Sequence, residues 1–544
     1  MEKTQVVIVG GGVTGAGILW DLTLRGVKAI LLEKADLANG ATGRCHGLLH
    51  SGARYAVKDP DAANECIREN RILRQVARPC VHETGGLFVH LPQDDAAFVG
   101  QWVEGCAKAG IPTEHLSGEE ALALEPNLPP DVVEAYTCPD AHIDVFQLVI
   151  ANVEAAVARG ASFKTYAEVT GIRRQNGSVT GVDYRDCLSG EPGSIECEIV
   201  INAAGGWAPR IANMARVDVP VRCDRGALLI MNQRLVNRVV NRCRKPGDAD
   251  ILVPAGPVCI LGTSSVTVPS PENLVVPPEE VRNLLALGSE LIPALAEARI
   301  LRIFTGARPL YAPKSASGAG GREISRGFAL LDHEHNDNLA GFVSIIGGKL
   351  TTYRLMAQVT ADLVCKKLGI QAQCQTDQVA LRTFPDDLGF REALMVLPPA
   401  VAEKAHRRLG GKLGELVAAI KREPALAEVV CECELVTRGE IEYVLRGSPV
   451  PAQTLADIGR RTRMGFGTCQ GTFCGYRAML TGYRDGKWSG EQAVAHLKTY
   501  LQERWKGQSW IPEGKQAEQL NLSHEVLSVA FNLENEGAGG GHAD

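Results

Sequence analysis

Residues 5–17 read QVVIVGGGVTGAG, a short β-branched run followed by spaced glycines. Gly10, Gly12 and Gly15 fit the G-x-G-x-x-G pattern of a dinucleotide-binding unit. The first glycine of this pattern permits a tight turn, the second lets the backbone approach a pyrophosphate, and the third lets helix and strand pack closely. We therefore predict a strand, a turn and then a helix over residues 14–26.

A second strand is predicted at residues 29–32, and it ends at Glu33. This is about the spacing at which an acid accepts a hydrogen bond from a ribose hydroxyl, which completes a βαβ unit. The fingerprint alone does not separate NAD from FAD, but only one complete fingerprint occurs, which disfavours a reductase with two such units. The candidate dinucleotide ligands in this unit are Gly10, Gly12, Val13, Thr14, Gly15, Glu33 and Lys34.

Length and composition indicate an ordinary globular protein of several domains. The 544 residues are 45% hydrophobic and 22% charged, and the formal charge of -6 gives no broad footprint for nucleic acid. The first strand begins almost at once, which leaves no room for a leader, and no run of about 18 apolar residues occurs. We expect a cytoplasmic protein, most of whose 16 cysteines are reduced thiols.

Residues 40–55 read GATGRCHGLLHSGARY, and from this segment on the chain resembles the FAD-dependent glycerol-3-phosphate dehydrogenases of the D-amino-acid-oxidase-like superfamily. The resemblance covers roughly residues 1–480 and, with the C-terminal cysteines, points to the anaerobic members. Five more segments carry it: NAAG at 202–205, NRCRKP at 241–246, DADILVP at 248–254, GARPL at 306–310 and GGKLTTYR at 347–354.

The resemblance implies FAD as cofactor, sn-glycerol 3-phosphate as substrate and dihydroxyacetone phosphate as product. It also implies two further subunits, one of them membrane-associated, which deliver electrons to quinone and hold this chain at the inner face of the membrane. A glycine-rich turn that only opens a helix would fit residues 347–354 equally well. The further FAD ligands implied are Thr42, Gly43, Gly47, Leu48, Leu49, Ala204, Gly205, Gly347, Gly348, Lys349, Leu350, Thr351 and Thr352.

Oxidising a secondary alcohol with flavin requires a proton acceptor beside the hydride acceptor, and positive charge for the phosphate. His50 is the first candidate for the base, because imidazole titrates nearest to working pH, although it could simply lie near the flavin. Arg54, with Tyr55, lies four to five residues further on. Arg308, Arg326 and Lys349 are phosphate candidates from the family motifs; for Arg54 and Arg308 the alternative is a surface ion pair.

Four cysteines stand close in pairs near the end of the chain, Cys431-x-Cys433 and Cys469-x4-Cys474. Four thiolates suffice for one 2Fe-2S cluster, and the segment resembles the bacterioferritin-associated ferredoxin-like domain. Zinc is the alternative, although its pairs usually have two to four residues between them. Between the pairs we predict a helix opened by a capping box at residues 437–440 and another near 451–461. The arginines expected near the cluster are Arg460, Arg461 and Arg463.

The predicted fold class is α/β, with a Rossmann-like FAD-binding domain, an antiparallel substrate cap that includes strands at 227–231 and 258–262, and a small α-helical cluster domain. The FAD-binding part would be built from the N-terminus and from roughly 150–210 and 325–370. We expect the following division: 1–380 oxidoreductase with cap, 381–425 connector, 426–482 cluster domain, 483–533 helical region and 534–544 disordered tail.

Two other functions remain open at this level. One is an amino-acid or amine dehydrogenase subunit of the same flavin superfamily, whose carboxylate substrate would need a single arginine. The excess cationic charge of Arg54, Arg308, Arg326 and Lys349 disfavours it. The other is a non-catalytic electron-transfer or scaffold subunit, which the complete set of substrate motifs disfavours.

Overall fold

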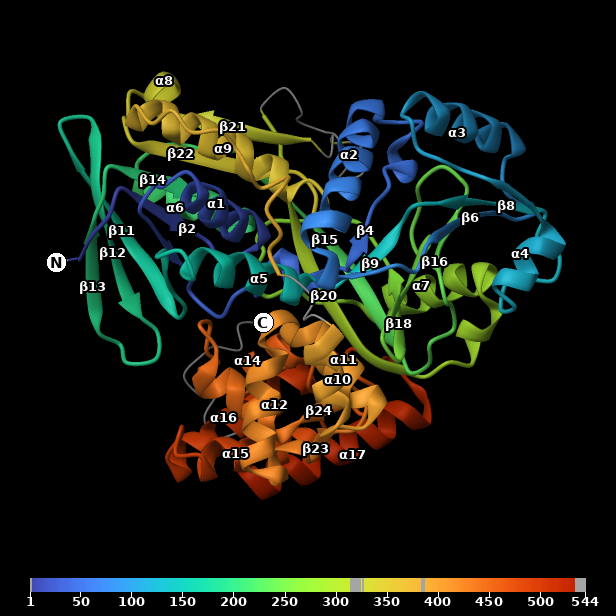
Figure 1. Cartoon of the computed structure of the whole chain (residues 1–544). Coiled ribbons are helices and arrows are strands. Elements are labelled where there is room, and N and C mark those ends of the chain that lie inside the picture. The colour runs from blue at the N-terminus through green and yellow to red at the C-terminus, as the bar shows by residue number, and fades with distance from the viewer. Residues whose placement is uncertain (1, 314–323, 325–326, 383–386, 534–544) are drawn as a thin grey trace.

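The computed structural model describes residues 2–313, 324, 327–382 and 387–533. Arg326 and the tail at 534–544 lie outside the described residues. Three bodies are visible in Figure 1: a central sheet with its helices, a broad second sheet at the right, and a block of C-terminal helices in orange and red below them. Among the described residues, no helix is both long and apolar enough to cross a membrane.

The central sheet is assembled from three distant stretches of the chain, as the sequence predicted. Its strands are parallel, except β21, which is antiparallel to β22, and the four inner strands are almost wholly buried, whereas the edge strands β10 and β21 are partly exposed. Continuous apolar runs such as VVIV are typical of strands covered on both faces. In spatial order the six strands are β10 (Ser162–Lys164), β3 (Ala29–Leu32), β2 (Val6–Val9), β14 (Ile199–Asn202), β22 (Phe342–Gly347) and β21 (Phe328–Asp332).

Successive side chains of these strands pack on opposite layers. Val6 and Ile8 face one core with α1 (Val13–Leu24), α5 (Val145–Val157) and α9 (Tyr353–Leu368). Val7 and Val9 face the other core with α6 and the sheet β1-β13-β12-β11. The bounds of this second layer are β1 (Glu2–Lys3), β11 (Ala167–Gln175), β12 (Ser178–Asp186), β13 (Pro192–Glu196) and α6 (Ala208–Met214).

The second sheet has nine strands and is antiparallel except where β16 runs parallel to β6. The predicted strands at 227–231 and 258–262 are confirmed as parts of β15 and β18, which pair directly. Helix α7 (Pro278–Leu291) packs its apolar face on this sheet. The strands are β19 (Val266–Val268), β15 (Val221–Met231), β20 (Ile300–Tyr311), β18 (Val258–Gly262), β17 (Ile251–Ala255), β16 (Val239–Arg242), β6 (Gly86–His90), β8 (Glu134–Cys138) and β7 (His115–Ser117).

Short elements link the two sheets. A small three-stranded sheet, β4-β9-β5, takes its first strand from the 40–55 segment. Its strands are β4 (Leu48–Leu49), β9 (Ala141–Ile143) and β5 (Val81–His82). Helix α4 (Gly118–Leu124) packs on β7 and β8 of the second sheet, and α8 (His333–Asp337) packs on β21 and β22 of the central sheet. The remaining helices of this part of the chain are α2 (Pro60–Val76) and α3 (Ala96–Lys108).

The C-terminal block forms two small cores. The first joins α10 (Asp387–Leu394), α11 (Pro399–Leu409) and α12 (Leu413–Arg422). The second runs from Val430 to Leu533 and includes Cys431, Cys433 and Cys474 together with residues of the last helices. Its elements are β23 (Val429–Cys431), β24 (Val436–Thr437), α13 (Arg438–Glu442), α14 (Leu455–Thr462), α15 (Cys474–Arg484), α16 (Gly490–Gln508) and α17 (Gly514–Phe531).

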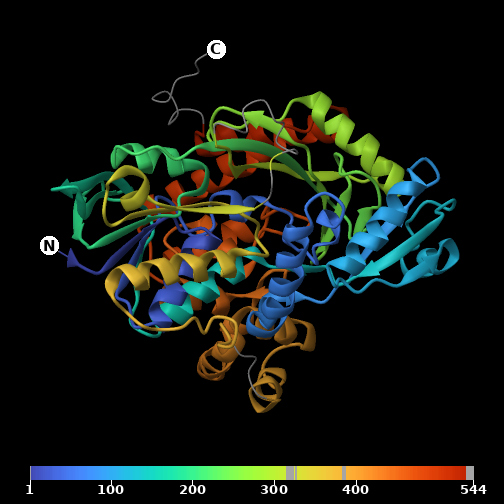
Figure 2. The same ribbon diagram turned by 90° about the horizontal axis from the view of Figure 1, so that it is seen from above.

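Local signals for two of these helices are confirmed. Thr437 and Glu440 form the reciprocal capping box that opens α13. The helix expected near 451–461 is α14, and it begins at Leu455 because Thr454 caps it with Asp457. Helix α14 contacts α5, and α16 contacts β20. The C-terminal block therefore packs on a helix of the central sheet and on a strand of the second sheet (Figure 1, Figure 2).

A steric prediction follows from the turn after β2. A Cβ placed on Gly15 would lie 1.9 Å from the carbonyl oxygen of Gly10. We expect Gly15→Ala to lower the free energy of unfolding by about 1–3 kcal/mol and to reduce bound FAD, because the helix must move away from the turn. Thermal unfolding and the flavin content of the purified protein measure this.

Gly100→Ala in α3 is the matched control, since no described atom lies within 4 Å of its Cβ position. Alanine there should be neutral or slightly stabilising, because it favours the helix. Equal stability and equal flavin content in the two variants would contradict the steric argument.

Candidate active site

A cavity of about 2160 Å³ opens at the carboxyl ends of β2, β3, β14 and β22. Ligands of open α/β sheets bind at this edge, and the volume exceeds the several hundred Å³ of an ordinary small-molecule pocket. Sixteen predicted FAD ligands line it, which brings the distant motifs together: Gly10, Gly12, Val13, Thr14, Glu33, Lys34, Thr42, Gly43, Gly47, Leu48, Ala204, Gly205, Gly347, Gly348, Lys349 and Leu350.

The other four predicted ligands lie just behind this wall and shape it. Gly15 packs on Gly10, and Leu49 is fully buried. The hydroxyl of Thr351 accepts a hydrogen bond from the backbone N–H of His50 at 3.0 Å. The hydroxyl of Thr352 accepts one from the N–H of Lys349 at 3.2 Å. These side chains hold the backbone that lines the cavity, and they do not themselves face the cavity.

The glycine turn fits a dinucleotide. Gly10 has a φ of +117°, and a Cβ there would lie 2.6 Å from the carbonyl oxygen of Ala203, so the turn needs glycine. The N-cap of α1 is Gly12, which offers no side chain, and the N–H of Val13 donates to the hydroxyl of Thr42 at 3.1 Å. A helix N-terminus that faces a cavity favours a phosphate group.

Glu33 follows the last residue of β3 and lines the cavity, so it could bind a ribose hydroxyl. Its two oxygens accept hydrogen bonds from the N–H groups of Gly11 at 2.7 Å and Ala35 at 3.0 Å. Burial raises the pKa of this carboxyl, against the two backbone donors. A carboxylate offers about four acceptor sites, so two backbone bonds leave room for a ribose hydroxyl.

The reactive end of the cavity carries His50, Tyr55 and Lys349. The ring centroids of His50 and Tyr55 are 5.4 Å apart, and the Lys349 ammonium lies 5.3 Å from the Tyr55 ring centroid. The amide of Asn70 donates to the carbonyl of His50, which holds the loop. Burial, with His46, Arg54 and Lys349 nearby, lowers the pKa of His50 well below its usual value, which favours the neutral ring.

Arg54 and Arg308 are not surface ion pairs. Arg54 donates to Asp250 at 3.0 Å, and Arg308 donates to Asp224 at 2.6 Å. Both carboxylates are fully buried, and both guanidinium groups line the cavity. A guanidinium has five N–H donors, so each can be anchored from behind and still bind an anion in the cavity.

Several cavity residues were missed by sequence reasoning. His46 lies in the 40–55 segment, four residues before His50, and their ring centroids are 6.2 Å apart. Its Nδ1 is buried without a hydrogen-bond partner among the described residues. Arg302, Tyr500 and Arg504 also line the cavity, the last two from α16. The spacing of the two histidines could have drawn attention to His46, but no local signal connects α16 with the cavity.

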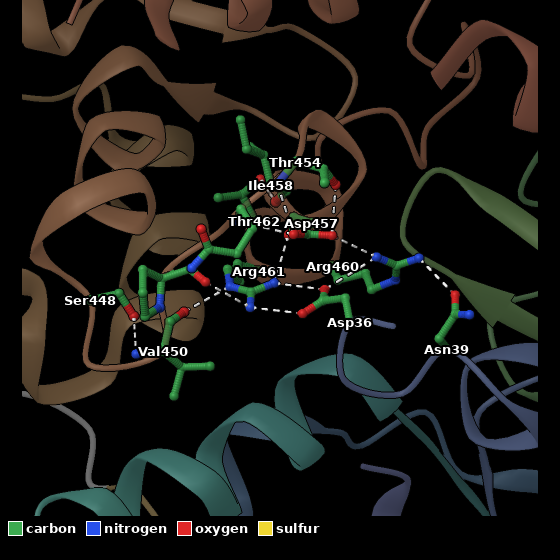
Figure 3. A network of polar contacts seen from close by, with 12 residues as sticks. Asp36, Asn39, Ser448, Val450, Thr454, Asp457, Ile458, Arg460, Arg461 and Thr462 are labelled. Atoms are coloured by element: carbon green, nitrogen blue, oxygen red, sulfur yellow. Dashed lines mark hydrogen bonds and ion pairs between the residues drawn. The ribbon is translucent and has the colours of Figure 1, made fainter. Parts of the chain in front are cut away.

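The three arginines expected beside the cluster are used differently. Arg461 donates to both oxygens of the buried Asp36, at 2.8 and 2.9 Å, and Arg460 reaches the same carboxylate at 3.1 Å (Figure 3). Arg463 pairs with Asp144 at 2.9 Å. Their charges therefore join the cluster segment to the cofactor domain, and Arg463 also pairs with Glu434, next to Cys433, so the expectation that these arginines lie near a cluster stays a prediction.

Asp36, the acid of the ion pairs in Figure 3, lies only three residues after Glu33, the predicted ribose ligand. Burial alone would raise the pKa of the Asp36 carboxyl, but Arg461 and Arg460 hold it below its usual value. Asn39 accepts a further hydrogen bond from Arg460 at 2.9 Å. The loop that leaves β3 thus contacts the cofactor cavity at one end and α14 at the other.

The four predicted metal ligands come together in the fold, but no group of three or more His, Cys, Asp or Glu has the arrangement of a metal site in the described part of the chain. Hydrogen bonding with the Cys474 thiol lowers the pKa of Cys469 to about 5 and that of Cys431 to about 7, and contacts with Cys431 and Cys469 raise the pKa of Cys474. The Cys433 thiol also contacts Cys469. Such thiolate character suits metal ligation.

Comparison with known proteins agrees with this geometry. The model of the FAD dependent oxidoreductase family matches residues 5–363. An anaerobic glycerol-3-phosphate dehydrogenase subunit of Escherichia coli (strain K12) is 42% identical over 540 residues, 98% of each chain. The corresponding subunit of Haemophilus influenzae is 44% identical and matches 98% of this chain and 94% of its own length.

The chain belongs to the family of these anaerobic glycerol-3-phosphate dehydrogenase subunits, within the FAD dependent oxidoreductases. The glycerol-3-phosphate dehydrogenase of Bacillus halodurans, solved with FAD, has the same fold, with a TM-score of 0.73, 21% identity and coverage of 94% of this chain and 96% of its own. The FAD-binding fold predicted from the sequence is thus confirmed. In this dehydrogenase subunit, the glycine turn, Glu33 and the 347–350 turn are the residues that would hold FAD.

The buried histidines of this dehydrogenase subunit predict acid sensitivity. Burial, with Arg308 and Arg54 nearby, lowers the pKa of His46 from 6.5 to about 3. Below pH 6.5 the unfolded chain binds a proton that the folded chain lacks, so stability is complete above that pH and falls as the pH decreases toward 3. One such histidine lowers the free energy of unfolding by up to about 1.4 kcal/mol for each pH unit of acidification in this range.

We expect His46→Gln to reduce this loss by about 1 kcal/mol between about pH 7.5 and about pH 5.5, measured by urea unfolding at both values. His335→Gln, on an exposed turn of α8, is the control and should keep the wild-type loss. An unchanged pH dependence in His46→Gln would contradict the assignment.

Proposed function

We propose that the chain oxidises sn-glycerol 3-phosphate to dihydroxyacetone phosphate. The observation that supports this best is the set of cationic groups that line the cavity beside its two histidines: Arg54 and Lys349 lie near His50, and Arg54 and Arg308 lie near His46. Three cationic groups exceed what a carboxylate substrate needs and suit a phosphate monoester. The near full-length likeness to glycerol-3-phosphate dehydrogenase subunits supports the same substrate.

The residues of the cavity divide the chemistry between them. Bound FAD supplies the hydride acceptor. Arg54 and Arg308, each anchored by a buried aspartate, bind the phosphate and so hold the secondary alcohol in a fixed position. His50 accepts the hydroxyl proton as the C–H bond breaks, because its ring is neutral and its backbone is fixed by Thr351. Lys349 adds positive charge where the phosphate or the reduced cofactor carries negative charge.

Cys431, Cys433, Cys469 and Cys474 would hold a 2Fe-2S cluster, which would supply a one-electron path away from the flavin. The mutual contacts of the four thiols support this part of the proposal. Since the relatives are named as subunits, we further propose two partner subunits that pass the electrons to quinone. The chain would then lie in the cytoplasm, at the inner face of the membrane, through those partners.

An amino-acid or amine dehydrogenase subunit is the alternative, because members of this flavin superfamily share the cavity. The two functions differ in the anion that the arginines bind. An amino-acid carboxylate would be satisfied by one guanidinium fork and would leave the second buried pair without a role. The Arg308 and Asp224 pair therefore favours the phosphate ester.

Anaerobic titration of the purified chain tests the proposal. The flavin absorption should bleach on addition of sn-glycerol 3-phosphate and should stay unchanged with D- and L-amino acids or simple amines. Bleaching by an amino acid, but not by glycerol 3-phosphate, would support the alternative. FAD that no substrate of either class reduces would instead indicate an electron-transfer or scaffold subunit.

A further inference from the structure

A pair of aromatic rings joins the cofactor cavity to the cysteine loop. Phe146 lies at the start of α5, and Phe466 lies between α14 and Cys469. Their ring centroids are 5.3 Å apart and their planes are inclined by 53°. Both rings line the cavity. One ring therefore belongs to the cofactor domain and the other to the segment that carries a proposed cluster ligand.

Close packing continues beyond each ring. A Cβ on Gly43, one of the predicted FAD ligands, would lie 2.7 Å from the Phe146 ring. A Cβ on Gly467 would lie 2.3 Å from the Cβ of Cys433. Because only glycine fits at these two positions, the backbone of Gly43 contacts the Phe146 ring directly, and the backbone of Gly467 contacts the Cys433 side chain directly. An unbroken series of contacts thus runs from Gly43 through Phe146, Phe466 and Gly467 to Cys433.

The same interface holds both rings in place. Arg461 on α14 binds Asp36, as Figure 3 shows, and α14 leads directly into the segment of Phe466. Arg463 binds Asp144, whose other oxygen accepts the N–H of Phe146 at 3.1 Å and so caps α5. The ion pairs fix the backbone on each side of the aromatic contact, and the rings fill the space between.

We propose that Phe466, seated on Phe146, is a positioning residue that sets the packed distance between the flavin cavity and the cysteine cluster, and so controls electron transfer between them. The inference rests on the proposed function. Reduced flavin gives up two electrons and a proton. Each electron in turn reduces one ferric iron of the cluster to ferrous and then leaves to a one-electron acceptor before the next follows. Neither ring forms or breaks a bond; packing matters because electron tunnelling weakens steeply across gaps.

Phe466→Ala and Phe473→Ala form a matched pair for the test. Both phenylalanines lie on the cysteine loop, but Phe473 is 60% exposed and has no place in the series of contacts. The oxidised holoprotein is mixed anaerobically with sn-glycerol 3-phosphate in the absence of an added acceptor, and flavin and cluster absorption are followed separately. Hydrogen exchange of residues 463–474 in the resting protein is the second measurement.

We expect Phe466→Ala to bleach its flavin at the wild-type rate, to reduce its cluster several-fold more slowly and to exchange faster at 463–474. Phe473→Ala should match the wild type in all three. Cluster reduction at the wild-type rate in Phe466→Ala overturns the proposal, and so does an equal slowing in Phe473→Ala.

A variant on the other side of the contact covers the case in which Phe466→Ala fails to assemble a cluster. Phe146→Ala removes the same ring contact but lies outside the cysteine loop, and it should show the same slowing and the same faster exchange. If glycerol 3-phosphate does not bleach even the wild-type flavin, the proposed function fails. Hydrogen exchange in the paired variants then decides alone whether Phe466 seats the loop.

Discussion

Arg308→Ala should lower kcat/KM for sn-glycerol 3-phosphate by roughly 30- to 4000-fold, which corresponds to the loss of about 2–5 kcal/mol when one partner of a close, desolvated charge pair is removed. The variant loses a guanidinium that lines the cavity and leaves the fully buried Asp224 without this partner. Because 30% of the Arg308 side chain is exposed, we expect a smaller loss of folding stability, about 1–3 kcal/mol. Steady-state kinetics and thermal unfolding measure the two effects.

Three comparisons separate substrate binding from general damage. Arg308→Lys keeps the charge without the fork and should recover part of kcat/KM. Arg282→Ala removes an exposed pair with Glu513 and should leave both activity and stability at the wild-type level. Glycerol, which lacks the phosphate, should be oxidised equally poorly by the wild type and Arg308→Ala. A wild-type kcat/KM for glycerol 3-phosphate in Arg308→Ala would rule out Arg308 as a phosphate ligand.

The parts of this fold that could be predicted are those in which neighbouring residues carry the whole signal. The glycine pattern with its flanking apolar runs predicted β2, α1 and β3, because the turn tolerates only glycine at Gly10 and Gly15. The capping box at Thr437 predicted α13. Each of these depends on groups within a few residues of one another, so propensity and spacing suffice.

The parts that were missed depend on partners far away in the sequence. Arg460 and Asp36 are 424 positions apart, and nothing near either residue in the sequence indicates the other. The same is true of Asp224, which comes from β15 and anchors Arg308 on β20 through strand pairing. Motif reasoning could find the arginines but not their buried carboxylates, and these decide that the arginines belong to the cavity wall rather than to the surface.

Cys474→Ser should abolish the cluster and with it all electron transfer beyond the flavin. Cys474 is 1% exposed and contacts both Cys431 and Cys469, so its loss removes the central thiol of the group. A serine hydroxyl is a poor replacement, because soft iron–sulfur centres require thiolate ligands. Iron content, visible absorption and the electron paramagnetic resonance signal after reduction should disappear, whereas anaerobic bleaching of the flavin by glycerol 3-phosphate should persist.

Cys187→Ser is the control, since that thiol is exposed on the hairpin between β12 and β13 and should leave every signal intact. A wild-type protein that carries stoichiometric zinc and no iron would contradict the cluster, and Cys474→Ser would then lose zinc instead. The two halves of the function are separable in this way because the glycine turn of the flavin cavity packs on one core, whereas Cys431, Cys433 and Cys474 pack in another. Zinc would leave the oxidation of the alcohol intact but remove the reason for a one-electron exit, so the electrons of the flavin would have to reach their acceptor directly.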